Sequence, residues 1–165
     1  MKAIIIIISV FFTHQAFSQN KITPEIFGRI QGNKFIIVGD SSKLKSKILN
    51  LIFSNRKEKA KLCVQISKSQ TIGETIEDYY FVLLQDKKKN IKIAKWLEKR
   101  GNDLLLVDEF NDKNYWQVLT TACIGKDDCS PQVVITDSKK EWICGHKLIC
   151  SKDKTCMKIS AIDNE

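Results

Sequence analysis

Residues 41–67, SSKLKSKILNLIFSNRKEKAKLCVQIS, decide the fold, because the spacing of their apolar side chains changes from a helical period to a strand period. Leu44, Ile48 and Ile52 recur at four-residue intervals, as the buried face of a surface helix requires. This pattern predicts a helix from about 42 to 57. A strand follows it directly, so the chain combines helix and sheet.

The second half of that stretch has the period of a strand. From Lys61 onward, Leu62, Val64 and Ile66 alternate with polar side chains, which predicts a half-buried strand. Short apolar runs between turn residues predict further strands. These are residues 34–38, 79–84, 104–107 and 115–122, and a hairpin in which 132–136 pairs with 141–144.

Three other segments are read from local chemistry. Residues 19–33 contain proline and glycines and predict an irregular lead-in with room for a short turn of helix or strand. Ser41 and Ser42 are the expected helix caps, because a serine oxygen can accept from the first backbone amides; residues 39–43 lack the glycine spacing of a phosphate loop. Residues 91–100 fit a strand or a helix, and the short turns on either side favour the strand.

The predicted fold class is α+β, with one helix packed on an antiparallel meander and a disulfide-rich C-terminal hairpin. The expected organisation is a signal peptide at 1–18, an α+β domain at 19–122, and a cysteine-rich tail at 123–165 that packs on the same domain. Over residues 34–108 the element order resembles that of cystatin-like domains. The inhibitory hairpin of that family has no match here, so the resemblance implies topology and no activity.

The start of the chain has the pattern of an export signal. Lys2 supplies a positive end, residues 3–12 are apolar, and Ala16 and Ser18 place small side chains where signal peptidase cleaves. The mature chain is therefore expected to begin at Gln19, in the periplasm or outside the cell. The apolar run is shorter than the roughly 20 helical residues that cross a bilayer, so no membrane span is expected after signal removal.

Export determines how the cysteines are interpreted, because an oxidising compartment pairs thiols as disulfides. If every thiol is paired, Cys63 must bond to one of the five tail cysteines. The spacings are too long for a structural zinc site, whose cysteines come in close C-x2-4-C pairs, and no C-x-x-C redox pair occurs. The disulfide candidates, with the pairing left open, are Cys63, Cys123, Cys129, Cys144, Cys150 and Cys156.

The tail also resembles a known group of proteins. The pattern Cys129-Ser-Pro131, Trp142-Ile-Cys144, Cys150 and Cys156-Met-Lys158 is similar to the cysteine-rich tails of small uncharacterised secreted proteins from Bacteroidota. The similarity covers about the last fifth of the chain. It implies export and disulfides, and no known activity.

No pattern in the sequence points to catalysis. His146 is the only histidine left once the signal is removed, and its cysteine-flanked loop favours a surface role over that of a catalytic base or metal ligand. The carboxylate clusters are interpreted as solvated turn charges, because Asp108 and Glu109 would point to opposite faces of a strand and Asp127 and Asp128 lie in a predicted turn between two cysteines. They are Glu74, Glu77 and Asp78; Asp108 and Glu109; and Asp127 and Asp128. We therefore expect no catalytic residues, no metal site and no cofactor.

The formal charge of +8 falls by one unit when Lys2 is removed, and a basic protein favours anionic partners. The candidate anion-binding surface combines the lysines of two predicted turns: Lys87, Lys88, Lys89, Lys139 and Lys140. It requires both turns to lie at one end of the sheet, beside Trp96, Trp116 or Trp142. Otherwise these lysines are solvated charges and the tryptophans pack in the core.

The leading functional hypothesis is a secreted, non-catalytic interaction domain stabilised by disulfides. Its expected partner is an extracellular or periplasmic protein or an anionic glycan, and not nucleic acid. Two alternatives stay open. One is a periplasmic inhibitor or immunity-like protein of a hydrolase, and the other is an enzyme or metal site around His146.

Overall fold

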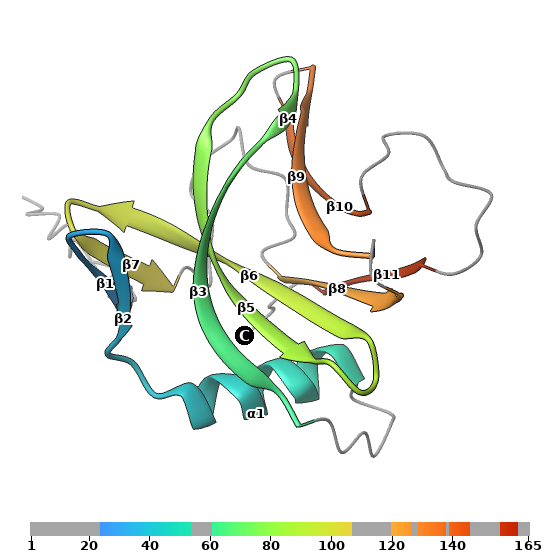
Figure 1. The fold of residues 1–165 in the computed structure, drawn as a ribbon, viewed down its shortest axis with the longest axis horizontal. Helices are drawn as coiled ribbons and strands as arrows, with labels where there is room; N and C mark the ends of the chain where they lie inside the picture. The colour runs from blue at the N-terminus through green and yellow to red at the C-terminus, as the bar shows by residue number, and fades with distance from the viewer. Residues whose placement is uncertain are drawn as a thin grey trace, which may run out of the picture.

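The computed structural model describes residues 24–53, 61–106, 120–126, 129–137, 139–145 and 156–161. The protein is mainly β, with an eight-stranded curled sheet, a three-stranded sheet and a single helix in these residues (Figure 1). The helix packs on a largely antiparallel sheet, which confirms the coarse form of the predicted fold class. The predicted signal peptide at 1–18 lies outside the described residues.

The elements follow one another in an order dominated by strands. They are β1 (Glu25–Gln31), β2 (Lys34–Ile37), α1 (Ser41–Phe53), β3 (Cys63–Gln70), β4 (Ile72–Gly73), β5 (Asp78–Asp86), β6 (Ile91–Arg100), β7 (Asp103–Leu106), β8 (Thr120–Gly125), β9 (Pro131–Thr136), β10 (Lys139–Cys144) and β11 (Cys156–Ala161). The expected strand at residues 91–100 and the expected hairpin of β9 and β10 are both confirmed.

Strand β6 is the centre of the large sheet, because three strands hydrogen-bond along its two sides. β5 pairs along one side and connects to β3. The other side is divided between β8, which pairs with residues 91–95, and β7, which pairs with residues 97–100. From this fork one arm continues to β1 and β2, and the other to β11.

Helix α1 buries one face against this sheet, as its spacing predicts. Leu44, Ile48 and Ile52 are buried in the main core. The cap is not a serine, however, and that prediction is wrong. The Asp40 carboxylate accepts from the Ser42 and Lys43 amides at 2.8 and 3.0 Å. Asp40 is itself a good cap residue, and one of its carboxylate oxygens satisfies two free amides of the first helical turn.

Two apolar layers lie on opposite faces of the large sheet. The inner layer faces α1 and includes Val82, Leu84 and Ile93. The outer layer lies beneath the sheet of β4, β9 and β10 and includes Phe81 and Trp142. Figure 1 shows this small sheet standing on the far side of β5 and β6 from the helix.

Strand β1 differs from the sequence-based expectation of an irregular lead-in. It pairs with β2 on one side and with β7 on the other. In the sequence, Gly28 suggests an interruption of the strand, but in the structure it faces a close neighbour. A Cβ at this position would lie 2.2 Å from Ile66 Cδ1. The glycine therefore permits β1 to approach β3, and it does not interrupt the strand.

In the described part of the chain, no helix combines the length and the apolar character that spanning a membrane requires.

Candidate functional site

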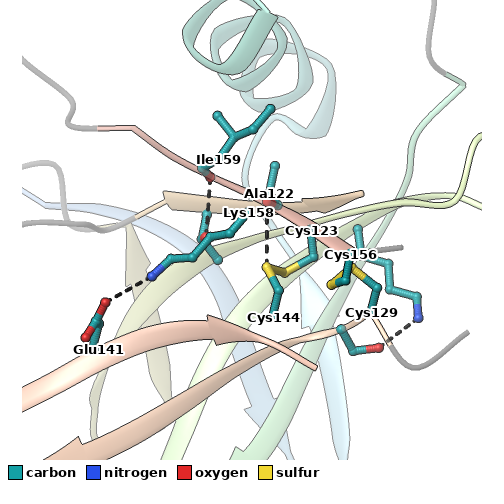
Figure 2. Close-up of a disulfide and its surroundings, with 11 residues drawn as sticks. Ala122, Cys123, Cys129, Glu141, Cys144, Cys156, Lys158 and Ile159 are labelled. Atoms are coloured by element: carbon teal, nitrogen blue, oxygen red, sulfur yellow. Dashed lines mark hydrogen bonds and ion pairs between the residues drawn. A yellow bond between two sulfur atoms is a disulfide. The ribbon is translucent and has the colours of Figure 1, made fainter. Parts of the chain in front are cut away.

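Two disulfides join the C-terminal strands, and Figure 2 shows both bonds. Cys123 of β8 bonds to Cys144 of β10, so this bridge connects the large sheet to the small one. Cys129, just before β9, bonds to Cys156 at the start of β11. The predicted presence of disulfides is confirmed, and the bonds fit an oxidising extracellular or periplasmic environment.

The expectation that every thiol is paired is not met. Cys63 is a free, exposed cysteine on β3. The four bridged cysteines are satisfied within the tail, so they do not tie the tail to Cys63. Cys150 lies outside the described residues.

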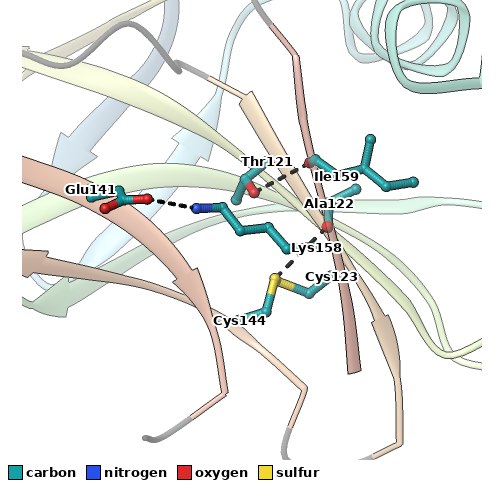
Figure 3. Close-up of polar contacts among 7 residues, drawn as sticks. All are labelled: Thr121, Ala122, Cys123, Glu141, Cys144, Lys158 and Ile159. Carbon is teal, nitrogen blue, oxygen red and sulfur yellow. Dashed lines mark hydrogen bonds and ion pairs between the residues drawn. A yellow bond between two sulfur atoms is a disulfide. The ribbon is translucent and has the colours of Figure 1, made fainter. Parts of the chain in front are cut away.

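Polar contacts support the bridges. Lys158 of β11 donates to Glu141 of β10 at 3.1 Å, across the same junction that the Cys123–Cys144 bond spans (Figure 3). In that figure the Ile159 carbonyl accepts from the Thr121 hydroxyl at 3.4 Å. β8 and β11 therefore form one ribbon that is fixed both to the large sheet and to β10.

The structure does not bring the two predicted lysine turns together. Residues 87–89 lie in the turn after β5, whereas Lys140 donates to Glu77, just before β5 begins. The nine residues of β5 separate the two places, which amounts to about 30 Å of extended chain. The candidate anion-binding surface is thus two separate groups of lysines.

The turn at 87–89 is built around Asp86, which is 5% exposed. Its carboxylate accepts from the Lys61 amide at 2.8 Å and from the Lys88 and Lys89 amides at 3.0 and 3.2 Å. These bonds, that from Lys61 above all, hold the pKa of Asp86 below its usual value. The turn therefore has a clear structural role.

The predicted core role of the tryptophans is confirmed where they are described. Trp142 is 4% exposed, and its ring meets Tyr79, Phe81 and Trp96 edge-on at centroid distances of 5.8, 5.9 and 6.1 Å. Trp96 stacks on Tyr79 at 5.6 Å. These rings fill the space between the two sheets, and burial raises the pKa of the Tyr79 hydroxyl. Trp116 lies outside the described residues.

A cluster that the sequence did not reveal lies at the rim of the inner layer. We call Lys68, Asp78, Tyr80 and Lys99 the Tyr80 cluster. Tyr80 is half-buried, and the Phe35 ring packs against it edge-on at 6.1 Å. The Lys68 and Lys99 ammonium groups lie 6.0 and 5.8 Å from the centre of the Tyr80 ring, close enough for cation–π attraction.

Sheet register positions the cluster. Lys68 of β3 is opposite Tyr80 of β5, and Tyr80 is opposite Leu97 of β6. Lys99 follows Leu97 by two residues and so shares its face. Cross-strand neighbours on one face lie about 5 Å apart, which brings side chains from three strands to one place.

The two lysines of the cluster differ in how closely a carboxylate approaches them. The Asp78 carboxylate binds the Lys68 ammonium at 2.5 Å and accepts from the Gln70 amide at 3.3 Å. The bond to Asp78 raises the pKa of Lys68, and the same bond lowers the pKa of Asp78. Among the described residues, Lys99 has no carboxylate at ion-pair distance. The Lys99 charge nevertheless helps to lower the pKa of Asp78, so the two lysines share one carboxylate and the cluster carries one positive charge in excess.

Sequence reasoning interpreted Asp78 as a solvated turn charge and gave Tyr80 only a strand position. The available signal was the alternation in β3, which places Lys68 on the same face as buried Ile66. A lysine on an apolar face at the end of a strand marks the rim of a core. Lys95 differs from this case, because it lies in the middle of β6 on the face of Ile93 and is 1% exposed, so it belongs to the buried interior.

The other candidates for chemistry can be located only in part. His146, Asp108, Glu109, Asp127 and Asp128 lie outside the described residues. Glu74 accepts from the Asp137 amide at 3.0 Å, and so ties the loop before β5 to the turn between β9 and β10. No group of three or more histidines, cysteines or carboxylates that could hold a metal occurs within the described ranges.

Comparison of the chain with protein-family models, with curated proteins and with solved structures finds no match.

Proposed function

We propose that this protein is an exported, non-catalytic binding domain that works in the periplasm or outside the cell. The observation that carries the proposal is the pair of disulfides between Cys123 and Cys144 and between Cys129 and Cys156. Such bonds persist in oxidising compartments and are rare where cellular reductants reach the protein. The signal pattern at residues 1–18 agrees with this localisation.

The described polar groups support binding rather than catalysis. Asp40 and Asp86 accept from backbone amides, and Arg29 binds Asp103 at 2.8 Å. A nucleophile with a positioned base needs side chains that converge on one reacting atom. These carboxylates instead stabilise a helix start, a turn and two strands. The similarity of the tail to secreted Bacteroidota proteins also supports the proposal of export, and it implies no activity.

Cell fractionation and intact mass measurement test the localisation. The source cells are separated into cytosol, periplasm and medium, and the protein is recovered from each fraction with an antibody. We expect a chain that begins at Gln19 in the periplasm or the medium. A full-length chain confined to the cytosol would overturn the proposal.

Complementation of a deletion strain tests the absence of catalysis. A His146→Ala variant is expected to restore the wild-type phenotype to the deletion strain as well as the unaltered chain does. Failure of that variant, when it is exported at a normal level, would favour an enzyme or metal site around His146 instead. Recovery of a stoichiometric hydrolase with the mature chain would identify the binding function as that of an inhibitor or immunity-like protein.

A further inference from the structure

We infer that the Tyr80 cluster binds acidic polysaccharide, by receiving a carboxylate or sulfate group of the sugar at Lys99 and, in competition with Asp78, at Lys68. This inference rests on the proposed function, because an exported domain meets such polymers. It names the ligand class and the place where the ligand binds.

The positions of Lys68 and Lys99 beside the Tyr80 ring are the first observation that supports this site. Both ammonium groups lie within 6.0 Å of the Tyr80 ring centre, although they come from different strands. Both side chains are exposed, and the Lys99 ammonium has no carboxylate at ion-pair distance among the described residues. An anion that approaches the ring therefore meets two positive charges on one face of the sheet, together with the one negative charge of Asp78, which leaves an excess of one positive charge.

The Asp78 carboxylate indicates which ligand atoms fit. It lies 2.5 Å from the Lys68 ammonium, with side chains 43% exposed on both partners. Lys68 therefore holds a carboxylate at an exposed position, which is the kind of group that an acidic sugar would present. Asp78 also competes with a ligand for Lys68, so its removal should strengthen binding.

The aromatic ring favours a sugar over an isolated ion. Tyr80 is half-buried and is held by Phe35 at 6.1 Å, so its position is fixed before a ligand arrives. An acidic sugar offers an acid group to the lysines and apolar C–H groups to the ring. A simple inorganic anion would use only the lysines.

A protein partner fits the cluster less well. Protein interfaces have an apolar core surrounded by a polar rim. The exposed large apolar side chains of the described residues lie elsewhere, and none belongs to the cluster. They are Ile26, Ile36, Val38, Ile76 and Met157.

Binding measurements with defined oligosaccharides test the inference. The mature chain is titrated by calorimetry with a heparin oligosaccharide, with an oligogalacturonate and with neutral dextran. We expect binding to at least one acidic sugar and none to dextran. Binding to the first alone identifies a sulfate site, and binding to the second alone identifies a carboxylate site. Binding to neither would overturn the inference.

Charge-matched variants separate the cluster from general basicity. Lys99→Gln should weaken binding at least about fivefold, whereas Lys88→Gln, with the same change of charge in the turn after β5, should leave it nearly unchanged. Asp78→Asn should tighten binding more than Asp103→Asn, which breaks a comparable exposed pair with Arg29. Equal effects within either pair of variants would contradict the inference.

The inference and the proposed function can fail separately. An exported protein that ignores both acidic sugars refutes only the polysaccharide site. A cytosolic protein refutes the proposed function whatever it binds in the calorimeter.

Discussion

Removal of the Cys123–Cys144 bond should lower the free energy of unfolding by a large fraction of its total value. The bond closes a sequence separation of 21 residues. The chain-entropy relation assigns such a loop a cost of about 11 cal/mol/K in the unfolded state, or about 3.3 kcal/mol at 25 °C. A domain of this size is typically stable by only about 5 to 15 kcal/mol.

The perturbation is the double variant Cys123→Ala with Cys144→Ala, in which both partners are removed so that no unpaired thiol remains. The Cys129–Cys156 bond stays in place, and its loop overlaps the first, so the two effects are not additive. Cys63→Ala is the matched control, because Cys63 is exposed and carries no disulfide.

Urea unfolding followed by tryptophan fluorescence measures the effect, with Trp142 as a reporter buried between the two sheets. We expect a loss of about 3 kcal/mol for the double variant and a change within about 0.5 kcal/mol for the control. A loss below about 1 kcal/mol would refute the reasoning that this bridge restricts the unfolded chain.

Three further predictions concern single residues. Gly73→Ala should cost more than about 2 kcal/mol, because φ is +103° and the new Cβ would lie 2.2 Å from the Ile135 carbonyl oxygen; Gly32→Ala, at φ +57° in open space, should cost only about 1 kcal/mol in the same thermal melts. Trp142→Ala should cost about 3 to 5 kcal/mol by urea unfolding, with Trp142→Phe recovering part of the loss, and a smaller cost for Ala would count against the packed interface between the sheets. The folded-state pKa of Asp86 is lowered, so its contribution is present above about pH 4 and is lost as pH falls through the folded pKa; the stability of Asp86→Asn should fall less between pH 5 and pH 2 than that of the unaltered protein, and parallel pH profiles would contradict this role.

Much of the secondary structure could be predicted because it follows from local spacing. The four-residue interval of Leu44, Ile48 and Ile52 gives the buried face of α1, and the polar turn before residue 91 separates β5 from β6. Both features depend on residues that are close in sequence. Periodicity records which side of an element is buried, so it succeeds wherever one face is apolar and the other polar.

The misses come from contacts between distant residues. Gly28 suggests a break, yet it lies within β1 because Ile66, far along the chain, occupies the space beside it. β4 is only two residues long and pairs in parallel with β9, a contact that no local pattern announces. Asp40, Ser41 and Ser42 are three adjacent residues that can all cap a helix, so cap preference alone cannot choose Asp40 among them.

The Tyr80 cluster was missed for the same reason. Lys68, Tyr80 and Lys99 belong to three strands, and only the register of β3, β5 and β6 brings them together. The candidate lysine turns show the converse case. Residues 87–89 and Lys140 look alike in sequence, but β5 places them at opposite ends. The net charge of the chain predicts the sign of a partner's charge, whereas pairing between strands decides where that partner binds.

Thiol mapping of protein isolated from its source without reductant tests the central claim most directly. The sample is alkylated, digested and analysed by mass spectrometry before and after reduction. The account predicts that Cys63 is labelled at once and that the four bridged cysteines are labelled only after reduction, with Cys123 linked to Cys144 and Cys129 linked to Cys156. Labelling of those four cysteines in the unreduced sample would contradict an exported, disulfide-stabilised domain.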